Sequence, residues 1–224
     1  MSVVIELFLG FIAVGAAGTI VSATRRSKAL TALVSLKGWE LTKNDRQLPD
    51  TFGGPPFTVG HKRVARRVVR GIHNGRAVLV FDYEYRTPGS DSDGDDVHHA
   101  WVACVDDLPA ALPALEVVAR TARRELVNRG GGQLAMPEIV VGDPAFDRRY
   151  HVYAANPQLA TDVLGPHVLR LIGSWPDFTW RVEGTRLLTW GSGVLKPHWI
   201  EPNLNMLVSL VEAVPDRVWQ TARG

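Results

Sequence analysis

The sequence of 224 residues is long enough for one substantial hydrophobic core, with or without an appendage. Its apolar share of 46% excludes a globally disordered chain, and its net charge of only +2 argues against a dedicated nucleic-acid or heparin-binding protein. The single cysteine, Cys104, cannot form an internal disulfide bond, which favours a reducing compartment.

An apolar run at residues 3–23 is the first distinctive segment, and Glu6 is its only charged residue. About 20 helical residues, each rising about 1.5 Å, span about 30 Å, which is the thickness of the hydrocarbon core of a bilayer. Arg25, Arg26 and Lys28 follow directly, and basic residues beside a membrane span tend to stay in the cytoplasm. The pattern predicts a single-pass protein of the cell membrane, with its N-terminus outside and its soluble domain cytoplasmic.

Two other interpretations of this run stay open. Residues 21–23 resemble a cleavage site, but a cleaved signal peptide carries basic residues before its apolar segment, and here there are none. A buried helix of a globular domain is the second alternative, although the run has no polar face. Glycine, alanine and serine are frequent in the run, and small residues let membrane helices approach closely. The lipid bilayer and, through the anchor, a second copy of the chain are the partners expected here.

The residues after the basic stop divide the chain into three expected parts. Leucine and valine at helical spacing predict a helix over residues 27–37, which Gly38 ends. Adjacent glycines and prolines at 53–56 favour an irregular loop over residues 43–60. We therefore expect a transmembrane helix with its basic stop at 1–26, a juxtamembrane helix and linker at 27–60, and an α+β soluble domain at 61–224.

The clearest strand signal is the hairpin sequence RVARRVVRGIHNGRAVLVFDYEYR at residues 63–86. Asn74-Gly75 suits a type I′ turn, since both central residues of that turn take a positive φ. In the second strand, one face is expected to pack on a core and the opposite face to be partly wet. The predicted core face carries Ala77, Leu79, Phe81, Tyr83 and Tyr85, and the wetter face carries Val78, Val80, Asp82, Glu84 and Arg86.

The remaining elements follow in chain order. Strands are predicted at 98–105, 115–119 and 148–154, a helix near 119–130, a hairpin at 178–190, and a final helix before Pro215. Asn156-Pro157 marks the start of a helix that Gly165-Pro166 breaks, after which a second helix resumes. Early strands and late helices predict an α+β fold, in which an N-terminal transmembrane helix precedes a mainly antiparallel sheet domain with packed helices.

Several of these segments resemble a known group of proteins. They are GW at 38–39, PPF at 55–57, the hairpin at 67–87, LPALEVV at 112–118, FDRRYHV at 146–152 and WRVEGTRLLTW at 180–190. Together they resemble an actinobacterial family of unknown function with an N-terminal membrane anchor, and more distantly a broader bacterial family of membrane-associated proteins. The chain departs from that pattern at Asp147 and Tyr150, where asparagine and phenylalanine are expected. The resemblance implies one anchor and an α+β domain, and it carries no catalytic residues.

Residues 89–99, GSDSDGDDVHH, are the strongest candidate for a metal site. Counted from Asp91, a calcium loop needs glycine at its sixth position and glutamate at its twelfth, where this chain has Asp96 and Val102. His98 and His99 are adjacent on a predicted strand, so their rings point to opposite faces and do not converge on one ion. The segment is therefore predicted to be a polar loop without metal ligands.

No recognised catalytic motif is found in the sequence. The histidines lack the spacing of a hydrolytic zinc site, and the glycine patterns of nucleophile elbows and nucleotide-binding loops are absent. Cys104 lies in an apolar strand, where it is expected to be a core residue. Asp82 and Glu84 share a strand face, but they are expected to pair with arginines. We expect no catalytic residues, no metal and no cofactor.

Six basic residues form a stretch without an acid among them, along the first strand of the hairpin and just past its turn: Lys62, Arg63, Arg66, Arg67, Arg70 and Arg76. They are predicted to form a solvated strand face that Asp82 and Glu84 balance. The alternative is contact with anionic lipid of the inner leaflet, where each basic residue contributes about 1 kcal/mol. The candidate lipid-contact residues are Arg25, Arg26, Lys28, Lys62, Arg63, Arg66, Arg67 and Arg70. Nucleic-acid binding is not expected, since aromatic residues are not interleaved with the patch.

The leading functional hypothesis is a non-enzymatic interaction or scaffold module with a protein partner at the inner membrane. An enzyme whose active site combines distant segments is the rival class, and an anionic-lipid sensor is a third. A deep pocket lined by converging polar groups would favour the enzyme, whereas an exposed apolar patch would favour the interaction module.

Overall fold

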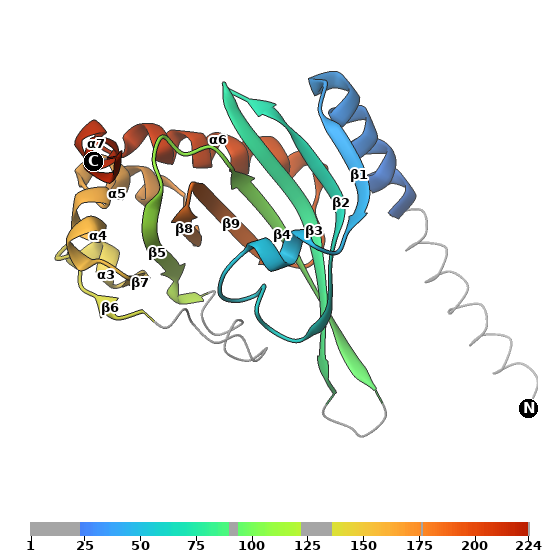
Figure 1. Ribbon diagram of the computed structural model, residues 1–224, viewed down its shortest axis with the longest axis horizontal. Coiled ribbons are helices and arrows are strands. Elements are labelled where there is room, and N and C mark those ends of the chain that lie inside the picture. The colour runs from blue at the N-terminus through green and yellow to red at the C-terminus, as the bar shows by residue number, and fades with distance from the viewer. Residues whose placement is uncertain (1–22, 90–93, 122–135, 176, 224) are drawn as a thin grey trace, which may run out of the picture.

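The computed structural model describes residues 23–89, 94–121, 136–175 and 177–223. Within these residues nine strands form one sheet in the order β1-β2-β3-β4-β9-β8-β5-β7-β6, and every neighbouring pair is antiparallel (Figure 1). The strands are β1 (Glu40–Asp45), β2 (His61–His73), β3 (Arg76–Pro88), β4 (Asp95–Val105), β5 (Leu112–Ala119), β6 (Glu138–Ile139), β7 (Tyr150–Ala154), β8 (Trp180–Gly184) and β9 (Arg186–Ser192).

Helices precede the sheet and alternate with its later strands. Residues 23–37 are helical, and Gly38 follows them with a positive φ of 65°, as the sequence predicts for a capping glycine. The other helices are the short 3-10 helix η1 (Leu48–Thr51), α3 (Pro144–Asp147), α4 (Pro157–Val163), α5 (Pro166–Ser174), α6 (Pro197–Ala213) and α7 (Asp216–Arg223). The protein is therefore an α+β protein built on an antiparallel sheet.

A late hairpin joins the two halves of the sheet. Strands β4 and β5 follow one another in the sequence, but the β8–β9 hairpin lies between them, with β9 paired to β4 and β8 paired to β5. The sheet is therefore continuous only when residues 180–192 are in place. The hairpin predicted at 178–190 is confirmed, but no local pattern indicates its position in the sheet.

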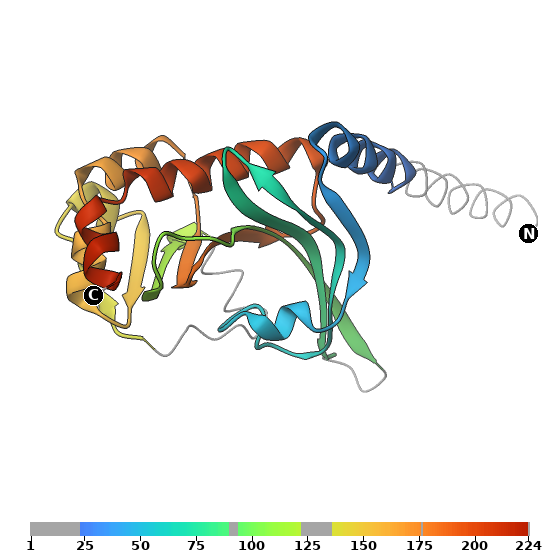
Figure 2. The ribbon, with the colours of Figure 1, turned by 45° about the horizontal axis from the view of Figure 1, so that its top comes forward.

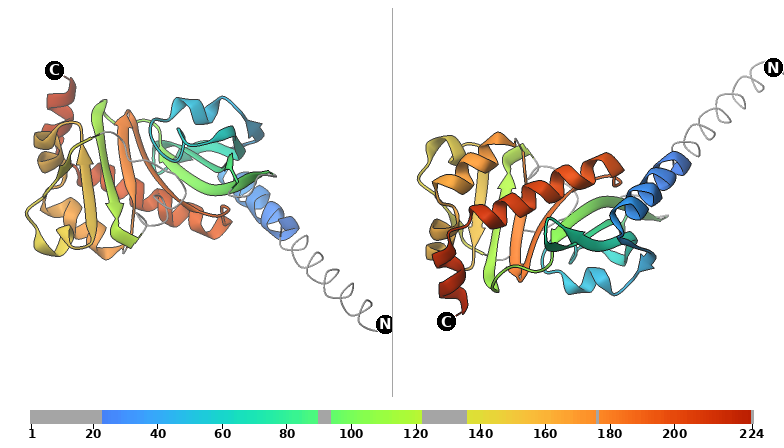
Figure 3. Two further views of the ribbon diagram at one scale, coloured as in Figure 1. Left: turned by 90° about the horizontal axis from the view of Figure 1, so that it is seen from below. Right: turned by 90° about the horizontal axis from the view of Figure 1, so that it is seen from above.

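Both faces of the sheet are covered over much of its area. The long helix α6 crosses one face of the sheet, and the helix at 23–37 lies near the first residues of α6 (Figures 2 and 3). The core under these helices contains Leu30, Val34, Val80, Trp180 and Leu207 among others. The opposite face is covered by η1 and the segment after it, where Phe52 and Phe57 pack on Phe81 and Tyr83.

The predicted hairpin at 63–86 is confirmed, with positive φ at both Asn74 and Gly75. The face of β3 that was expected to be partly wet is partly exposed only at Glu84 and Arg86, and the rest of it is covered. Val78 and Val80 lie in the helix-covered core, and Asp82 is only 3% exposed. Asp82 Oδ1 accepts a hydrogen bond from the backbone N–H of Leu195, which comes from a segment 113 residues later. Alternation within one strand cannot reveal that a distant segment covers the second face.

The predicted fold class, which opened with a transmembrane helix, requires correction. No helix among the described residues is long and apolar enough to cross a membrane. The helical residues 23–37 belong to the packed fold, because Leu30 and Val34 are buried against the sheet and Lys37 forms an ion pair with Glu201. The rest of the predicted span, residues 3–22, lies outside the described residues.

The segment at 27–60 also contributes to the sheet and its cores. Residues 43–60 were predicted to be irregular, but strand β1 extends through Asp45 and η1 follows it. The indole of Trp39 lies against Gly71, where an added Cβ would meet the ring at 1.9 Å, and its Nε1 donates a hydrogen bond to the carbonyl of Ile72. The structure therefore places this segment within the same fold as the hairpin.

Later elements agree well with the sequence patterns. The side chain of Asn156 caps α4 by accepting a hydrogen bond from Leu159 N, and α5 resumes after Gly165-Pro166, as predicted. The helix α7 after Pro215 was not predicted. The helix predicted near 119–130 falls mostly on residues 122–135, which lie outside the described residues.

Candidate functional site

The basic residues of β2 are paired within the protein. Arg66 forms a bidentate pair with Glu84 at 2.8 and 3.0 Å, and this pairing lowers the pKa of the Glu84 carboxyl. Arg67 donates to Asp82 at 2.6 Å. Three more ion pairs join Lys62 to Asp95 at 3.0 Å, Arg63 to Asp50 at 2.8 Å and Arg70 to Asp45 at 3.2 Å. The predicted pairing of this strand face with Asp82 and Glu84 is therefore observed.

The other predicted lipid-contact residues lie on the helix at 23–37. Arg25 and Lys28 are exposed to solvent, whereas Arg26 is half-buried. Burial and the nearby charge of Arg67 lower the pKa of the Arg26 guanidinium. Contact with anionic lipid through any of these residues stays a prediction, and Arg25 and Lys28 are its most accessible members.

The aspartate-rich segment joins β3 and β4, and residues 90–93 in its middle lie outside the described residues. Asp95 accepts hydrogen bonds from His61 and Lys62. His98 stacks on Tyr85 and hydrogen-bonds Thr87, while His99 pairs in register with Glu84, so the two adjacent rings point to opposite faces as predicted. Across the part of the chain that the structure describes, no three His, Cys, Asp or Glu side chains gather in a way that could hold a metal ion.

A buried charge cluster lies on the opposite face of β5 and β8 from α6. Arg181 is fully buried, and its guanidinium lies 3.2 Å from Glu183 and 3.7 Å from Glu116. It also donates to the carbonyls of Pro55 and Gly53 at 2.9 and 2.5 Å. Burial raises the pKa of both glutamates. Through Arg181 the cluster bonds the loop at 53–57 to the sheet, so its role is structural.

Cys104 is likewise a structural residue. It is fully buried between strands, and burial raises the pKa of its thiol. A thiolate is the reactive form of cysteine, so this position does not suit a nucleophile.

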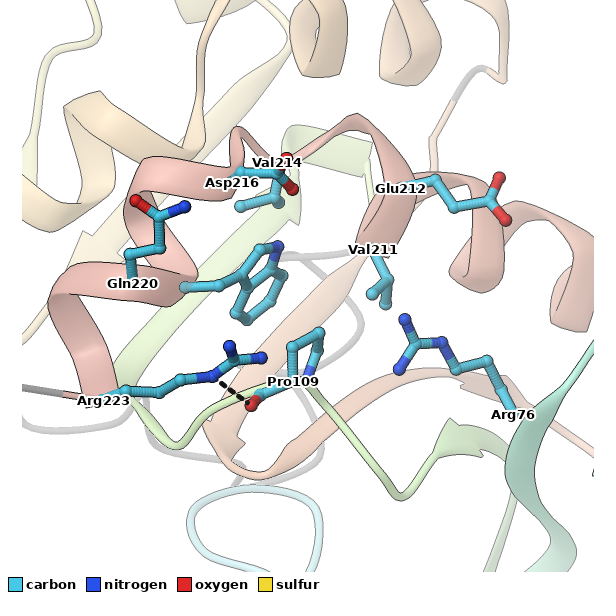
Figure 4. A pocket seen from close by; sticks show the side chains of 9 residues that line it. Arg76, Pro109, Val211, Glu212, Val214, Asp216, Gln220 and Arg223 are labelled. Atoms are coloured by element: carbon cyan, nitrogen blue, oxygen red, sulfur yellow. Dashed lines mark hydrogen bonds between the residues drawn. The ribbon is translucent and has the colours of Figure 1, made fainter.

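A groove of about 430 Å³ lies where α6, α7, the β4–β5 connection and the start of β3 meet (Figure 4). Its size falls within the range of about 300–1,000 Å³ that is typical of small-molecule sites. Its apolar lining consists of Pro109, Val211, Val214 and Trp219, and its polar lining consists of Arg76, Glu212, Asp216, Gln220 and Arg223. We take this groove as the candidate functional site.

The local sequence explains why the groove forms. Pro215 disfavours a helical conformation at the residue before it, so α6 ends at Ala213 and Val214 is extended. The chain then turns into α7, whose Val218 and Trp219 are buried in the main core. The change of direction between the two helices leaves a hollow beside the connection that contains Pro109.

Two arginines are held on the side of the groove that Pro109 forms. Arg76 Nη1 donates to the carbonyl of Asp107 at 3.0 Å, and Arg223 Nε donates to the carbonyl of Pro109 at 3.1 Å. Figure 4 shows their guanidinium groups on either side of Pro109, with Glu212 and Asp216 on the opposite, helical rim. Among the described residues, neither arginine has a carboxylate within ion-pair distance.

A second hollow of about 350 Å³ lies between α3 and α5. It also contains two arginines, but both interact with neighbouring rings of the protein. Arg149 lies 5.5 Å from the centre of the Tyr150 ring, and Arg170 Nη2 donates to His167 Nδ1. The groove beside α7 therefore offers the more available cationic groups.

Sequence reasoning missed most of the groove. It named Arg76 only as the last member of the basic stretch, and it named none of the residues from α7. The sequence DRVWQTAR after Pro215 carries buried Val218 and Trp219 beside exposed polar residues, and this amphipathic pattern is the signal that would have predicted α7. No local pattern relates Arg76 to Arg223, because only the tertiary fold brings the two residues to the same groove.

These features define an α+β protein with one antiparallel sheet and an open, two-arginine groove. No family model and no curated protein matches the sequence, so the resemblance to an anchored actinobacterial family stays a prediction. Among solved structures, the fold is similar to the crystal structure of the mycobacterial trehalose monomycolate transport factor A, TtfA, with a TM-score of 0.63 at 12% sequence identity. The match covers 85% of this chain and 94% of that protein, so the two share a fold over nearly their whole lengths.

Proposed function

We propose that this protein is a non-enzymatic accessory factor, which binds a ligand and a protein partner at the membrane surface without converting either chemically. The character of its candidate site is the observation that carries the proposal. The groove presents fixed guanidinium groups, an indole and apolar side chains, and the described residues bring no nucleophile and general base together in it. Such a lining suits recognition better than catalysis.

Three further observations support this proposal. Among the described residues, burial raises the pKa of Tyr83, Cys104, Glu116, Tyr150 and Glu183. None of these five residues lines the groove, and the two glutamates are engaged with Arg181. The solved protein of similar fold is described as a transport factor. Exposed Arg25 and Lys28 on the first helix are available to an anionic membrane surface.

A turnover experiment separates this function from the rival enzyme class. The purified full-length chain is incubated with a small-molecule extract of its own host, and the compounds are followed over time by mass spectrometry beside a heat-denatured sample. We expect no compound to be consumed or formed in a time-dependent way. Time-dependent consumption that depends on the folded protein would instead establish an enzyme and refute the proposed function.

A cross-linking experiment tests the interaction itself. A photoreactive amino acid replaces Gln220 on the groove or, as a control, Lys43 on the exposed strand β1. In the host we expect one membrane-associated protein to cross-link at the groove position and not at the control. Equal labelling from both positions would count against a partner at this site.

A further inference from the structure

The groove beside α7 has the chemistry of an oxyanion site. Arg76 is half-buried and comes from the first residue of β3, whereas Arg223 is exposed and comes from the last turn of α7. Each uses one N–H in a bond to a backbone carbonyl of the β4–β5 connection, which fixes the direction of the side chain. The remaining N–H groups of both guanidiniums are the donors that a planar or tetrahedral oxyanion requires.

The apolar part of the groove limits the kind of anion that fits. Val211, Val214 and Trp219 are nearly buried and form the wall between the two arginines and the helical rim. A hydrated inorganic ion would leave this wall in contact with water, whereas a short hydrocarbon attached to the anion would cover it. Burial of this apolar surface favours binding of such a ligand.

The acidic residues of the groove lie where they determine the orientation of an anionic ligand. Glu212, near the end of α6, and Asp216, the first residue of α7, occupy the rim opposite Pro109 (Figure 4). Their charges disfavour an anion on that side, so the anionic group is directed toward Arg76 and Arg223. Carboxylates on the far rim are also suitable acceptors for hydroxyl groups.

We propose that this groove binds a phosphate or carboxylate group that carries a short apolar chain, with the oxyanion held between Arg76 and Arg223. This inference rests on the proposed function as a binding factor and names its ligand class. The anion comes either from a soluble metabolite or from the headgroup of a membrane lipid, since both present the same chemistry to the two guanidiniums.

Calorimetric titration of the full-length protein tests the site with three soluble probes: hexyl phosphate, inorganic phosphate and 1-hexanol. We expect hexyl phosphate to bind more tightly than either of the others, because only it satisfies both the arginines and the apolar wall. In the double variant R76Q/R223Q we expect its affinity to fall by at least about tenfold, as two charge-assisted hydrogen bonds are lost.

The matched control is K43Q/R46Q, which removes two exposed positive charges on and beside β1. It should bind hexyl phosphate as the wild type does. Because Arg76 is half-buried, thermal unfolding is used to check that R76Q/R223Q is folded. R223Q alone changes an exposed position and provides a second test, in which a smaller loss of affinity for hexyl phosphate is expected.

Vesicles separate the two sources of the anion. Binding to phosphatidylcholine vesicles that contain phosphatidic acid, lost in R76Q/R223Q, assigns a lipid headgroup, and binding of hexyl phosphate without vesicle binding assigns a soluble ligand. The proposal is overturned if no anionic probe binds the wild type, if 1-hexanol binds as tightly as hexyl phosphate, or if R76Q/R223Q retains wild-type affinity. The turnover experiment above is independent, so failure here leaves the non-enzymatic function to be judged separately.

Discussion

At the scale of single residues, the buried Arg181 is the most consequential side chain of the structure. It lies on β8 between Trp180 and Val182, which point to the other face, and its sequence context resembles an ordinary half-exposed strand. In the fold its guanidinium lies 5.0 Å from the centre of the Trp190 ring and contacts carbonyls of residues about 126 positions earlier in the chain. A buried cation is stable only where its partners are all present, so this residue couples three distant segments.

Replacement of Arg181 by methionine should destabilise the protein by about 3–5 kcal/mol, because Glu116 and Glu183 lose their buried counter-charge. Burial already raises the pKa of both glutamates above the unfolded value, and the variant raises it further. A raised carboxyl pKa means that stability is greatest below the unfolded pKa and is lost as the pH rises through the folded pKa. The deficit of R181M relative to the wild type should therefore be larger at neutral pH than near pH 5.

Urea denaturation of both proteins at the two pH values measures this difference. E183Q serves as the control, since it removes one carboxylate but leaves the cation and Glu116 in place. A deficit for R181M that is independent of pH would indicate lost packing and lost carbonyl bonds alone.

At the scale of elements, the helix at residues 23–37 is the part whose role differs most from the sequence-based prediction. Residues 23–26 were assigned to the end of a transmembrane helix and its basic stop, and residues 27–37 to a separate juxtamembrane helix. In the structure Leu30 and Val34 are buried in the main core, whereas Leu36 is 82% exposed. The helix therefore has an inner and an outer face, as a surface helix of a folded domain does.

Truncation of Leu30 to alanine should lower the free energy of unfolding by about 2–4 kcal/mol, because it leaves a cavity between the helix and the sheet. Leu36→Ala is the matched control on the same helix, and its effect should stay within about 0.5 kcal/mol. Chemical denaturation of the full-length chain measures both. Equal, small effects of the two changes would mean that the helix does not contribute to the cooperative fold.

At the scale of the whole molecule, the basic side chains differ in how available they are to an anion outside the protein. The arginines of β2 are balanced by carboxylates on neighbouring strands, while Arg25 and Lys28 are exposed at one end of the molecule. The helix that carries them lies at the opposite end of the sheet from α3 and α7 (Figure 1). Binding to an anionic membrane surface through Arg25 and Lys28 should therefore depend on the end of the molecule that carries this helix.

Sedimentation with vesicles that contain phosphatidylglycerol tests this expectation. We expect R25Q/K28Q to bind at least about tenfold more weakly than the wild type, since each basic residue near such a surface contributes about 1 kcal/mol. R148Q/R217Q removes the same net charge at the other end and should bind as the wild type does. A wild-type protein that ignores these vesicles at low salt would end the lipid-contact hypothesis.

The sequence by itself determined the local structure of this protein. The Asn74-Gly75 turn, the Asn156 cap, the Gly38 helix end and the alternation in β3 each depend on conformational preferences or periodicities within a few residues. These preferences hold whatever surrounds the segment, so reading the residues was sufficient to predict an α+β chain with antiparallel hairpins.

The tertiary structure alone decided which surfaces are covered and which residues meet. The insertion of β8–β9 between β4 and β5, the burial of Asp82 and Arg181, and the placement of Arg76 and Arg223 on one groove all join segments about 65 to 150 residues apart. Their stability comes from apolar burial and from paired buried charges, which depend on the packing of the complete sheet and its helices. No window of neighbouring residues contains that information, and the candidate site is built from it.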